Sequence, residues 1–131
     1  MRLQEGTLTK PCMTDLPAET CRMLVATLAR IGDKWSMLTI VSLEDGGLRF
    51  NALRKRIGIS QKVLTSTLRG LERDGYVSRM VTPAKPLRVD YDLTDMCREV
   101  LGPVRVLAGW ALGQTERIEQ ARRRYDERTD N

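Results

Sequence analysis

Residues 48–93 constrain the fold of this chain more than any other segment. Two short stretches with helical spacing of apolar residues are separated by Gly58, and two β-branched and aromatic stretches follow, joined by residues 82–86 with their two prolines. Glycine favours the end of a helix, and proline stiffens a hairpin tip because its ring fixes φ. The segment therefore predicts a helix, a tight turn, a second helix and a β-hairpin.

Basic residues are concentrated in the same part of the chain. Residues 49–88 contain ten Lys or Arg and two acidic residues, a balance of +8, whereas the whole chain has 22 Lys and Arg against 17 Asp and Glu, or +5. The rest of the chain is net acidic, with 12 basic and 15 acidic residues. Extending the window through Asp90 and Asp92 lowers its balance to +6. A positive field confined to one structural unit indicates a polyanionic partner, and nucleic acid is the first candidate.

Length and composition indicate one globular domain with a real core. The chain has 131 residues, of which 41% are apolar and 30% charged, as is ordinary for a globular protein. No apolar run approaches the roughly 20 residues that span a bilayer. Residues 1–11 lack the charged-then-apolar pattern of a secretory signal. We therefore expect a cytoplasmic protein with no membrane partner.

The side chains that most enzymes need are missing. Histidine is absent, which excludes His-dependent triads, imidazole bases and zinc sites with a His ligand. The three cysteines, Cys12, Cys21 and Cys97, share no CxxC spacing, so we expect neither a disulfide scaffold nor a zinc knuckle but three free thiols. Without a Gly-rich phosphate loop or a cluster of metal ligands, we expect no catalytic residue, no cofactor and no metal.

Apolar spacing and capping residues predict the order of the elements. The expected fold class is mainly α with a small β-hairpin (α+β). Asp33 and Ser60 are expected helix N-caps, and Gly32, Gly58 and the pair Asp74-Gly75 are expected helix ends. We expect helices over residues 18–32, 33–44, 49–57 and 60–74, strands over 76–81 and 87–93, and a long helix from 94 toward 125 that is broken or bent at Pro103.

The helix over residues 60–74 has two chemically different faces. One face is an apolar stripe, which holds the helix from behind. The other face is polar and rich in hydrogen-bond donors, as a helix that enters the major groove requires. On the sequence alone, a merely solvated basic face is the alternative. The apolar stripe consists of Val63, Leu64, Thr67, Leu68 and Leu71, and the polar face of Gln61, Lys62, Thr65, Ser66 and Arg69.

Several motifs in order along the chain resemble those of one known family. They are the sequences IGDKW at residues 31–35, RFNALR at 49–54, ISQKVLT at 59–65, LRGLE at 68–72 and YDLT at 91–94, followed by Pro103-Val104, Leu107 and Trp110. Together they cover roughly residues 21–110, and they resemble the HxlR-type family of bacterial winged helix-turn-helix regulators.

The resemblance implies a function and a division of the chain. It implies a homodimer that binds a pseudo-palindromic operator in double-stranded DNA and controls transcription without catalytic activity, with repression the commoner role. The corresponding parts are an N-terminal arm (1–17), a winged helix-turn-helix DNA-binding domain (18–93), a dimerisation helix (94–125) and a charged tail (126–131).

Carried onto this sequence, the resemblance assigns residues 60–74 as the recognition helix. Glutamine can pair bidentately with adenine, and Arg or Lys with guanine, so its polar face can read bases. Cations on the preceding helix are expected to hold phosphates, and those of the hairpin to reach the minor groove or its phosphates. The expected DNA-binding residues are Ser60, Gln61, Lys62, Thr65, Ser66 and Arg69 on the recognition helix, Arg49, Lys55 and Arg56 before it, and Arg79, Lys85 and Arg88 in the wing.

The C-terminal helix carries a seam that suits a second helix. Its apolar and small residues alternate at spacings of four and three from Cys97 through Ile118, as in helix pairs. The alternative is that this face covers its own domain. With the resemblance, we expect a dimer that sets two recognition helices roughly 34 Å apart. The expected interface residues are Leu24 and Leu28 in the first helix and Leu101, Val104, Leu107, Ala108, Trp110 and Ala111 in the last.

A cysteine is one candidate for the residue that senses a signal. Several family members are thought to sense oxidants or electrophiles through a cysteine just ahead of an IG-x-KW segment. Cys21 lies near that position, although it is about one residue further from Ile31 and is followed by Arg22 in place of the usual proline. Arg22 can lower the thiol pKa, whereas a place on the apolar stripe favours an inert core thiol. Cys12 is the second redox candidate, and Cys97 is expected to pack.

Two other functions remain open from the sequence. One is a winged-helix module that binds protein, which the +8 window disfavours and a salt titration tests. The other is a regulator whose inducer is a small apolar ligand at the dimer interface.

Overall fold

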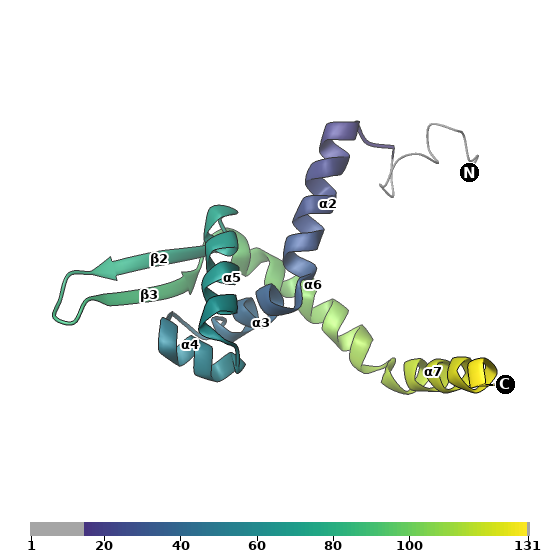
Figure 1. The fold of residues 1–131 in the computed structure, drawn as a ribbon. Helices are drawn as coiled ribbons and strands as arrows, with labels where there is room; N and C mark the ends of the chain where they lie inside the picture. Colours follow the sequence, from purple (N-terminus) through teal and green to yellow (C-terminus); the bar gives the residue numbers. More distant parts are fainter. Residues whose placement is uncertain (1–14, 131) are drawn as a thin grey trace. The chain divides into compact units, whose positions relative to one another are not determined.

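The computed structural model describes residues 15–130, and Cys12 lies outside them. The chain divides into two compact units, and the boundary along the sequence lies between Thr94 and Asp95. The first unit contains four helices among the described residues, α2 (Ala18–Gly32), α3 (Lys34–Ser42), α4 (Phe50–Ile57) and α5 (Gln61–Arg73), and a small sheet (Figure 1). The expected class, mainly α with a β-hairpin, is confirmed.

Side-chain caps begin two of these helices as expected. The Asp33 carboxylate accepts a hydrogen bond from the backbone N–H of Ser36 at 3.0 Å. The Ser60 hydroxyl accepts one from the backbone N–H of Val63 at 3.2 Å. Each cap satisfies a donor that has no partner within its own helix, which stabilises the helix by about 1 kcal/mol. Helix α3 ends two residues before the expected Glu44, because Leu43 already turns its N–H toward the carbonyls of both Thr39 and Ile40.

The turn between α4 and α5 depends on Gly58. Its φ is +75°, a left-handed conformation that side chains with a Cβ rarely adopt. In this conformation the N–H groups of Gly58 and Ile59 both donate to the carbonyl of Arg54, at 2.9 and 3.4 Å. Ile59 is buried directly after the turn. A bonded, anchored turn of this kind fixes the direction in which α5 leaves α4.

The expected hairpin is present and pairs with a third strand. Strands β2 (Val77–Thr82) and β3 (Arg88–Leu93) are antiparallel, with Val81 opposite Val89. The sequence analysis did not anticipate strand β1 (Leu48–Arg49), which adds to the other edge of β3 and gives the order β1-β3-β2. Two residues are too short for the alternation of side chains to show. Strand β1 nevertheless attaches the start of α4 to the wing.

The core of the first unit lies among α3, α4, α5 and the base of the sheet. Its fully buried aliphatic side chains each contribute about 1.5–3 kcal/mol by leaving water. The buried polar side chains are bonded internally: the hydroxyls of Thr39 and Thr67 donate to the carbonyls of Trp35 and Val63, at 2.7 and 2.8 Å. The fully buried aliphatic residues of this unit are Ile40, Leu43, Leu53, Leu64 and Leu71.

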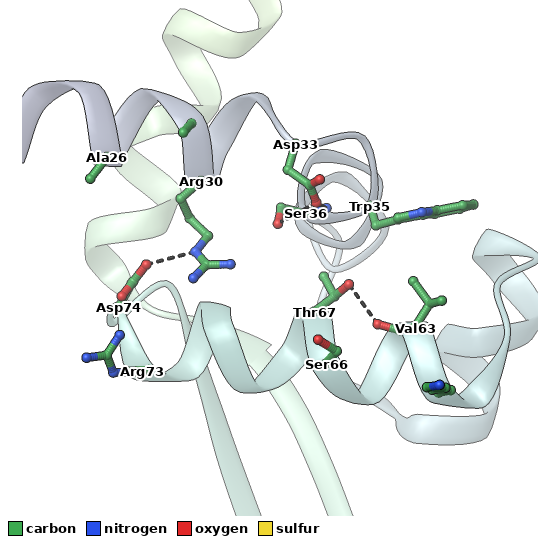
Figure 2. Close-up of a pocket in the computed structure, with 12 residues that line it drawn as sticks. Ala26, Arg30, Asp33, Trp35, Ser36, Val63, Ser66, Thr67, Arg73 and Asp74 are labelled. Carbon is green, nitrogen blue, oxygen red and sulfur yellow. Dashed lines mark hydrogen bonds and ion pairs between the residues drawn. The ribbon is translucent and has the colours of Figure 1, made fainter.

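An ion pair joins the last turn of α2 to the residue that follows α5. The Nε atom of Arg30 lies 2.8 Å from a carboxylate oxygen of Asp74 (Figure 2). The guanidinium lies over Gly70, and a Cβ added to that glycine would come within 2.7 Å of the Arg30 Cζ atom. Gly70 therefore provides the space that lets Arg30 reach Asp74.

The second unit consists of α6 (Asp95–Leu112) and α7 (Thr115–Asp130). The sequence predicted a helix broken or bent at Pro103, and the break is wrong because α6 continues through that proline. A bend there stays a prediction. Proline lacks one N–H donor, and a single missing bond need not end an otherwise regular helix. The break comes at Gly113, whose N–H donates to the carbonyls of both Gly109 and Trp110. Residues 126–130, expected as a charged tail, belong to α7.

The contact between Arg30, Gly70 and Asp74 predicts a coupled effect on stability. Asp74→Asn should lower the free energy of unfolding by about 0.2–1 kcal/mol, the usual contribution of an exposed ion pair. In a Gly70→Ala background the same change should cost almost nothing, because the new methyl group has already displaced the Arg30 guanidinium. Urea denaturation of the four proteins measures this coupling. Gly102→Ala is the matched control, since a Cβ there meets nothing within 4 Å. An equal cost of Asp74→Asn in both backgrounds would contradict the contact.

Candidate nucleic-acid interface

Helix α5 separates its apolar and polar residues onto opposite faces. Leu64, Thr67, Leu68 and Leu71 are buried, while Val63 is half-buried. The remaining face is available to a partner. Of the residues expected there, Ser60, Gln61, Lys62, Ser66 and Arg69 are exposed and Thr65 is half-buried.

Arg73 belongs to the same exposed face, and the sequence analysis missed it. At about 100° per residue, Lys62, Ser66, Arg69 and Arg73 fall within a narrow angular range opposite the buried leucines. Arg73 is exposed and ends the helix. Its spacing of four residues from Arg69 was the signal that could have identified it. The polar face therefore extends over the whole of α5.

The cations that precede α5 differ in their surroundings. Arg49 is exposed at the N-cap position of α4, and Lys55 is exposed in the last turn of that helix. Arg56 is also exposed, but its Nη1 atom donates to the carbonyl of Ser42 at 3.0 Å, at the end of α3. Arginine has five N–H donors, so this bond leaves others available. Arg56 thus holds two helices together in addition to any contact with a ligand.

The wing carries three exposed cations. Arg79 on β2 faces Tyr91 on β3, and it lines a cavity of about 330 Å³ together with Arg69. Lys85 and Arg88 line another, of about 740 Å³, together with Arg49. The fold thus brings the wing cations next to those of α4 and α5.

Arg88 already has an internal partner. Its Nε atom lies 2.8 Å from a carboxylate oxygen of Asp90 on the same strand. The hydrogen bond and the charge of Asp90 raise the pKa of the Arg88 guanidinium above its usual value. Arg88 therefore remains protonated, but part of its charge is neutralised within the wing, in contrast to Arg79 and Lys85, for which the described residues show no ion pair.

One expectation about the cysteines is wrong. Cys21, in the first turn of α2, is 1% exposed and disulfide-bonded, so it is not the free thiol expected. Its bond does not involve Cys97, which is a buried thiol. The count and spacing of the cysteines could not show this pairing, because spacing says little about which sulfurs meet in space. Burial raises the pKa of the Cys97 thiol, which disfavours its reactive thiolate form.

Helices α2 and α6 each expose apolar side chains. Leu28 is exposed on α2, while Leu24 is half-buried. On α6, Leu101 is buried and Val104 is half-buried. Leu107 and Trp110 are about 60% exposed, and Ala108 and Ala111 are exposed as well. Val106 and Leu112, which the sequence analysis did not include, are 75% exposed. Contiguous exposed apolar side chains of this size are typical of surfaces that bind a partner.

Other kinds of site are absent from the part of the chain that the structure describes. Within residues 15–130, no group of three or more His, Cys, Asp and Glu side chains is placed to hold a metal ion. No helix in the same range is long and apolar enough to cross a membrane.

Comparison with known proteins identifies the family. The model of the HxlR-like helix-turn-helix family matches residues 30–119. The uncharacterized HTH-type transcriptional regulator YtfH of Escherichia coli is 38% identical over 84 residues, which are 63% of this chain and 67% of that protein. The relatives and the family as a whole are DNA-binding transcriptional regulators and not enzymes.

Two solved structures share the fold at substantial identity. The reduced form of the transcriptional regulator YodB from B. subtilis is 32% identical with a TM-score of 0.66, covering 72% of this chain and 93% of that one. The redox regulator HypR in its reduced form is 34% identical with a TM-score of 0.69, covering 75% and 98%. The chain belongs to the HxlR-like helix-turn-helix family, and it is a transcriptional regulator of the helix-turn-helix type.

Proposed function

We propose that the protein is a cytoplasmic, homodimeric repressor that binds a pseudo-palindromic operator and responds to oxidants through Cys21. The observation that carries the DNA-binding part is the exposed polar face of α5, which lies opposite the buried leucines of the same helix. Arg69 on this helix lines one cavity with Arg79 of the wing, and Arg49 at the start of α4 lines another with the wing cations Lys85 and Arg88. A helix whose opposite face is packed in the core can enter the major groove without losing that packing.

The roles of the side chains follow from their positions. Gln61, Lys62, Thr65, Ser66 and Arg69 face outward from α5, so they are assigned to base edges, with Ser60 at the helix start. Base-edge contacts determine which sequence is bound.

Cations on the flanking elements are assigned to the phosphate backbone. Arg49 and Lys55 lie on either end of α4, and Arg56 is assigned a weaker contact because it also binds Ser42. Arg79, Lys85 and Arg88 belong to the wing. Phosphate contacts give affinity and register without sequence information, and they make binding sensitive to salt.

The exposed apolar side chains support the homodimer. Leu28 on α2 and Leu107 and Trp110 on α6 would be covered by a second copy of the chain. Closed two-fold pairing is the commonest arrangement for soluble oligomers, and it matches a palindromic operator. The pairing would place the two recognition helices roughly 34 Å apart, one turn of DNA.

The disulfide at Cys21 supports a redox response. The chain has three cysteines and Cys97 is not in a disulfide, so we propose Cys12 as the thiol that pairs with Cys21 on oxidation. Forming this bond from two thiols releases two protons and two electrons to the oxidant. YodB has been solved in reduced and diamide-treated forms, and HypR in reduced and oxidized forms.

The signal has a route to the recognition helix within the first unit. Cys21 and Arg30 lie on the same helix, nine residues or about 14 Å apart. Arg30 is paired with Asp74 at the end of α5. A displacement of α2 on oxidation would therefore act on α5 through this ion pair.

The two classes of DNA contact predict different mutant behaviour. Arg69→Ala should reduce the preference for operator over scrambled DNA, because it removes a base contact worth about 1–3 kcal/mol. Arg49→Ala should weaken binding to both DNAs by the same factor. Fluorescence anisotropy titrations of reduced protein over a range of salt concentrations measure both effects. Arg22→Ala, an exposed arginine on α2, is the control. Salt-insensitive binding would reject DNA as the partner, and identical behaviour of both variants would reject the assigned roles.

The dimer predicts that a charge on α6 gives monomers. Leu107→Glu should shift the sedimentation coefficient from dimer to monomer, because the carboxylate would be buried without a partner. Leu87→Glu in the wing is a matched control, since the two leucines are 60% and 62% exposed. A wild-type protein that sediments as a monomer would rule out the homodimer.

The cysteine switch predicts loss of DNA affinity on oxidation. Diamide should weaken operator binding of the wild type by tenfold or more, and dithiothreitol should restore it. Cys21→Ser and Cys12→Ser should remove the response, because neither can form the bond. Cys97→Ala should keep it, since that thiol is buried with a raised pKa. A Cys21→Ser protein that still responds to diamide would refute the switch.

A further inference from the structure

A cleft lies between α2, α3 and α5, on one flank of the proposed recognition helix. Its volume is about 940 Å³. Ala26 on α2 lines one side, and Ser66 and Arg73 on α5 line the other (Figure 2). Lys62 on α5 is also among the lining residues. Three residues that expose polar groups on α5 therefore also face this cleft. None of the DNA contacts proposed above uses its α2 side.

The charges in the cleft favour an anion. Its two carboxylates have partners, because Asp33 accepts hydrogen bonds from Ser36 and Asp74 is paired with Arg30. Lys62 and Arg73, in contrast, have no ion pair among residues 15–130. Lys34 adds a further positive charge beside the cleft, where it lies 4.5 Å from the ring centroid of Trp35. A cationic ligand would meet an Asp74 carboxylate and a Trp35 ring that already have a cation beside them, and an Asp33 carboxylate that is already hydrogen-bonded to Ser36.

Arg30 also has donors to spare. Only its Nε atom is within ion-pair distance of Asp74, at 2.8 Å. Its two Nη atoms lie close to the position that a Cβ of Gly70 would occupy, on the side of the guanidinium that faces α5 (Figure 2). A planar guanidinium with two donors side by side suits a phosphate or carboxylate group.

The spacing of the cations distinguishes an extended polyanion from a small ligand. Lys62 and Arg73 are eleven residues apart on α5, which is about 16 Å along the helix axis. A one-ring organic acid cannot reach both ends. A nucleic-acid strand carries a phosphate at each nucleotide and can pass both cations.

We propose that this cleft receives a backbone strand of the bound DNA, with Arg73 and the Nη groups of Arg30 as phosphate ligands beside Lys62. The proposal rests on the proposed DNA-binding function and extends its surface to α2. Arg30 then has two roles, since one side of its guanidinium holds Asp74 and the other binds phosphate. The phosphate would connect α2 with α5, so DNA binding itself would strengthen the contact between the two helices.

The salt dependence of binding tests the proposal. In the proposed homodimer each substitution removes two phosphate contacts, one per protomer. Arg73→Gln and Arg30→Gln should therefore each lower the magnitude of the slope of log K against log salt by about 1.8. The advantage of the wild type over each variant should then grow about 12-fold when the salt concentration falls from about 200 to about 50 mM. Operator and scrambled DNA should be affected alike, because phosphates carry no sequence information.

Two control variants separate phosphate binding from a structural role of Arg30. Asp74→Asn breaks the ion pair but keeps the Arg30 charge, so it should leave the salt slope unchanged. Arg30→Lys should retain most of the slope that Arg30→Gln loses. Unchanged slopes in Arg30→Gln and Arg73→Gln would overturn the proposal, as would a slope that falls as far in Asp74→Asn as in Arg30→Gln. A wild type without any salt dependence would instead refute the proposed DNA-binding function.

Discussion

The burial of one face of α5 is the constraint on which the rest of the structure depends. Leu64 and Leu71 are completely buried and Leu68 nearly so, and together they contribute several kcal/mol to folding. This packing fixes the rotation of α5 about its own axis. The cap at Ser60 and the left-handed Gly58 fix where the helix begins. The outward direction of Lys62, Ser66, Arg69 and Arg73 follows, so the face that we propose for DNA recognition is a consequence of core packing.

The contact between α2 and α5 has a different character. It consists of a partly exposed ion pair over a glycine and not of interlocked leucines. Exposed ion pairs contribute about 1 kcal/mol or less, so this contact is weak compared with the packing of α5 on α3 and β2. A weak contact can be changed by a signal without unfolding the domain. Helix α5 is therefore packed tightly through its buried leucines, whereas its contact with α2 is a weak ion pair.

Local signals in the sequence identified most of the fold. Asp33, Ser60 and Gly58 act through hydrogen bonds and a backbone conformation that involve close neighbours, and the structure has them as expected. Strand β1 was missed because two residues form a strand only when β3 is beside them. The helix predicted to be broken or bent at Pro103 does not break there, because one missing N–H donor does not end α6, which ends before Gly113. The disulfide at Cys21 depends on distance in space, which spacing along the chain does not contain.

The site shows the same division between local and spatial information. Helical periodicity was enough to find the exposed face of α5, and it would have found Arg73 had it been carried one turn further. Counting charges was less informative. The +8 window includes Arg88, which is paired with Asp90, and Arg56, which is bonded to Ser42. It excludes Arg30, which the fold brings to the flank of α5.

The cations with donors available to a phosphate thus overlap only in part with the cations that cluster in the sequence. A phosphate is attracted by every nearby charge, but it gains most from donors that have no carboxylate of their own. By this criterion Lys62, Arg73 and the Nη groups of Arg30 are better phosphate ligands than Arg88. Of these four residues, the sequence predicted Lys62 and Arg88 as DNA contacts but not Arg30 or Arg73. An arginine on α2 that contacts both Asp74 and the DNA would also join the helix that carries Cys21 to the bound operator. Oxidation at Cys21 and release of DNA would then be linked through one side chain.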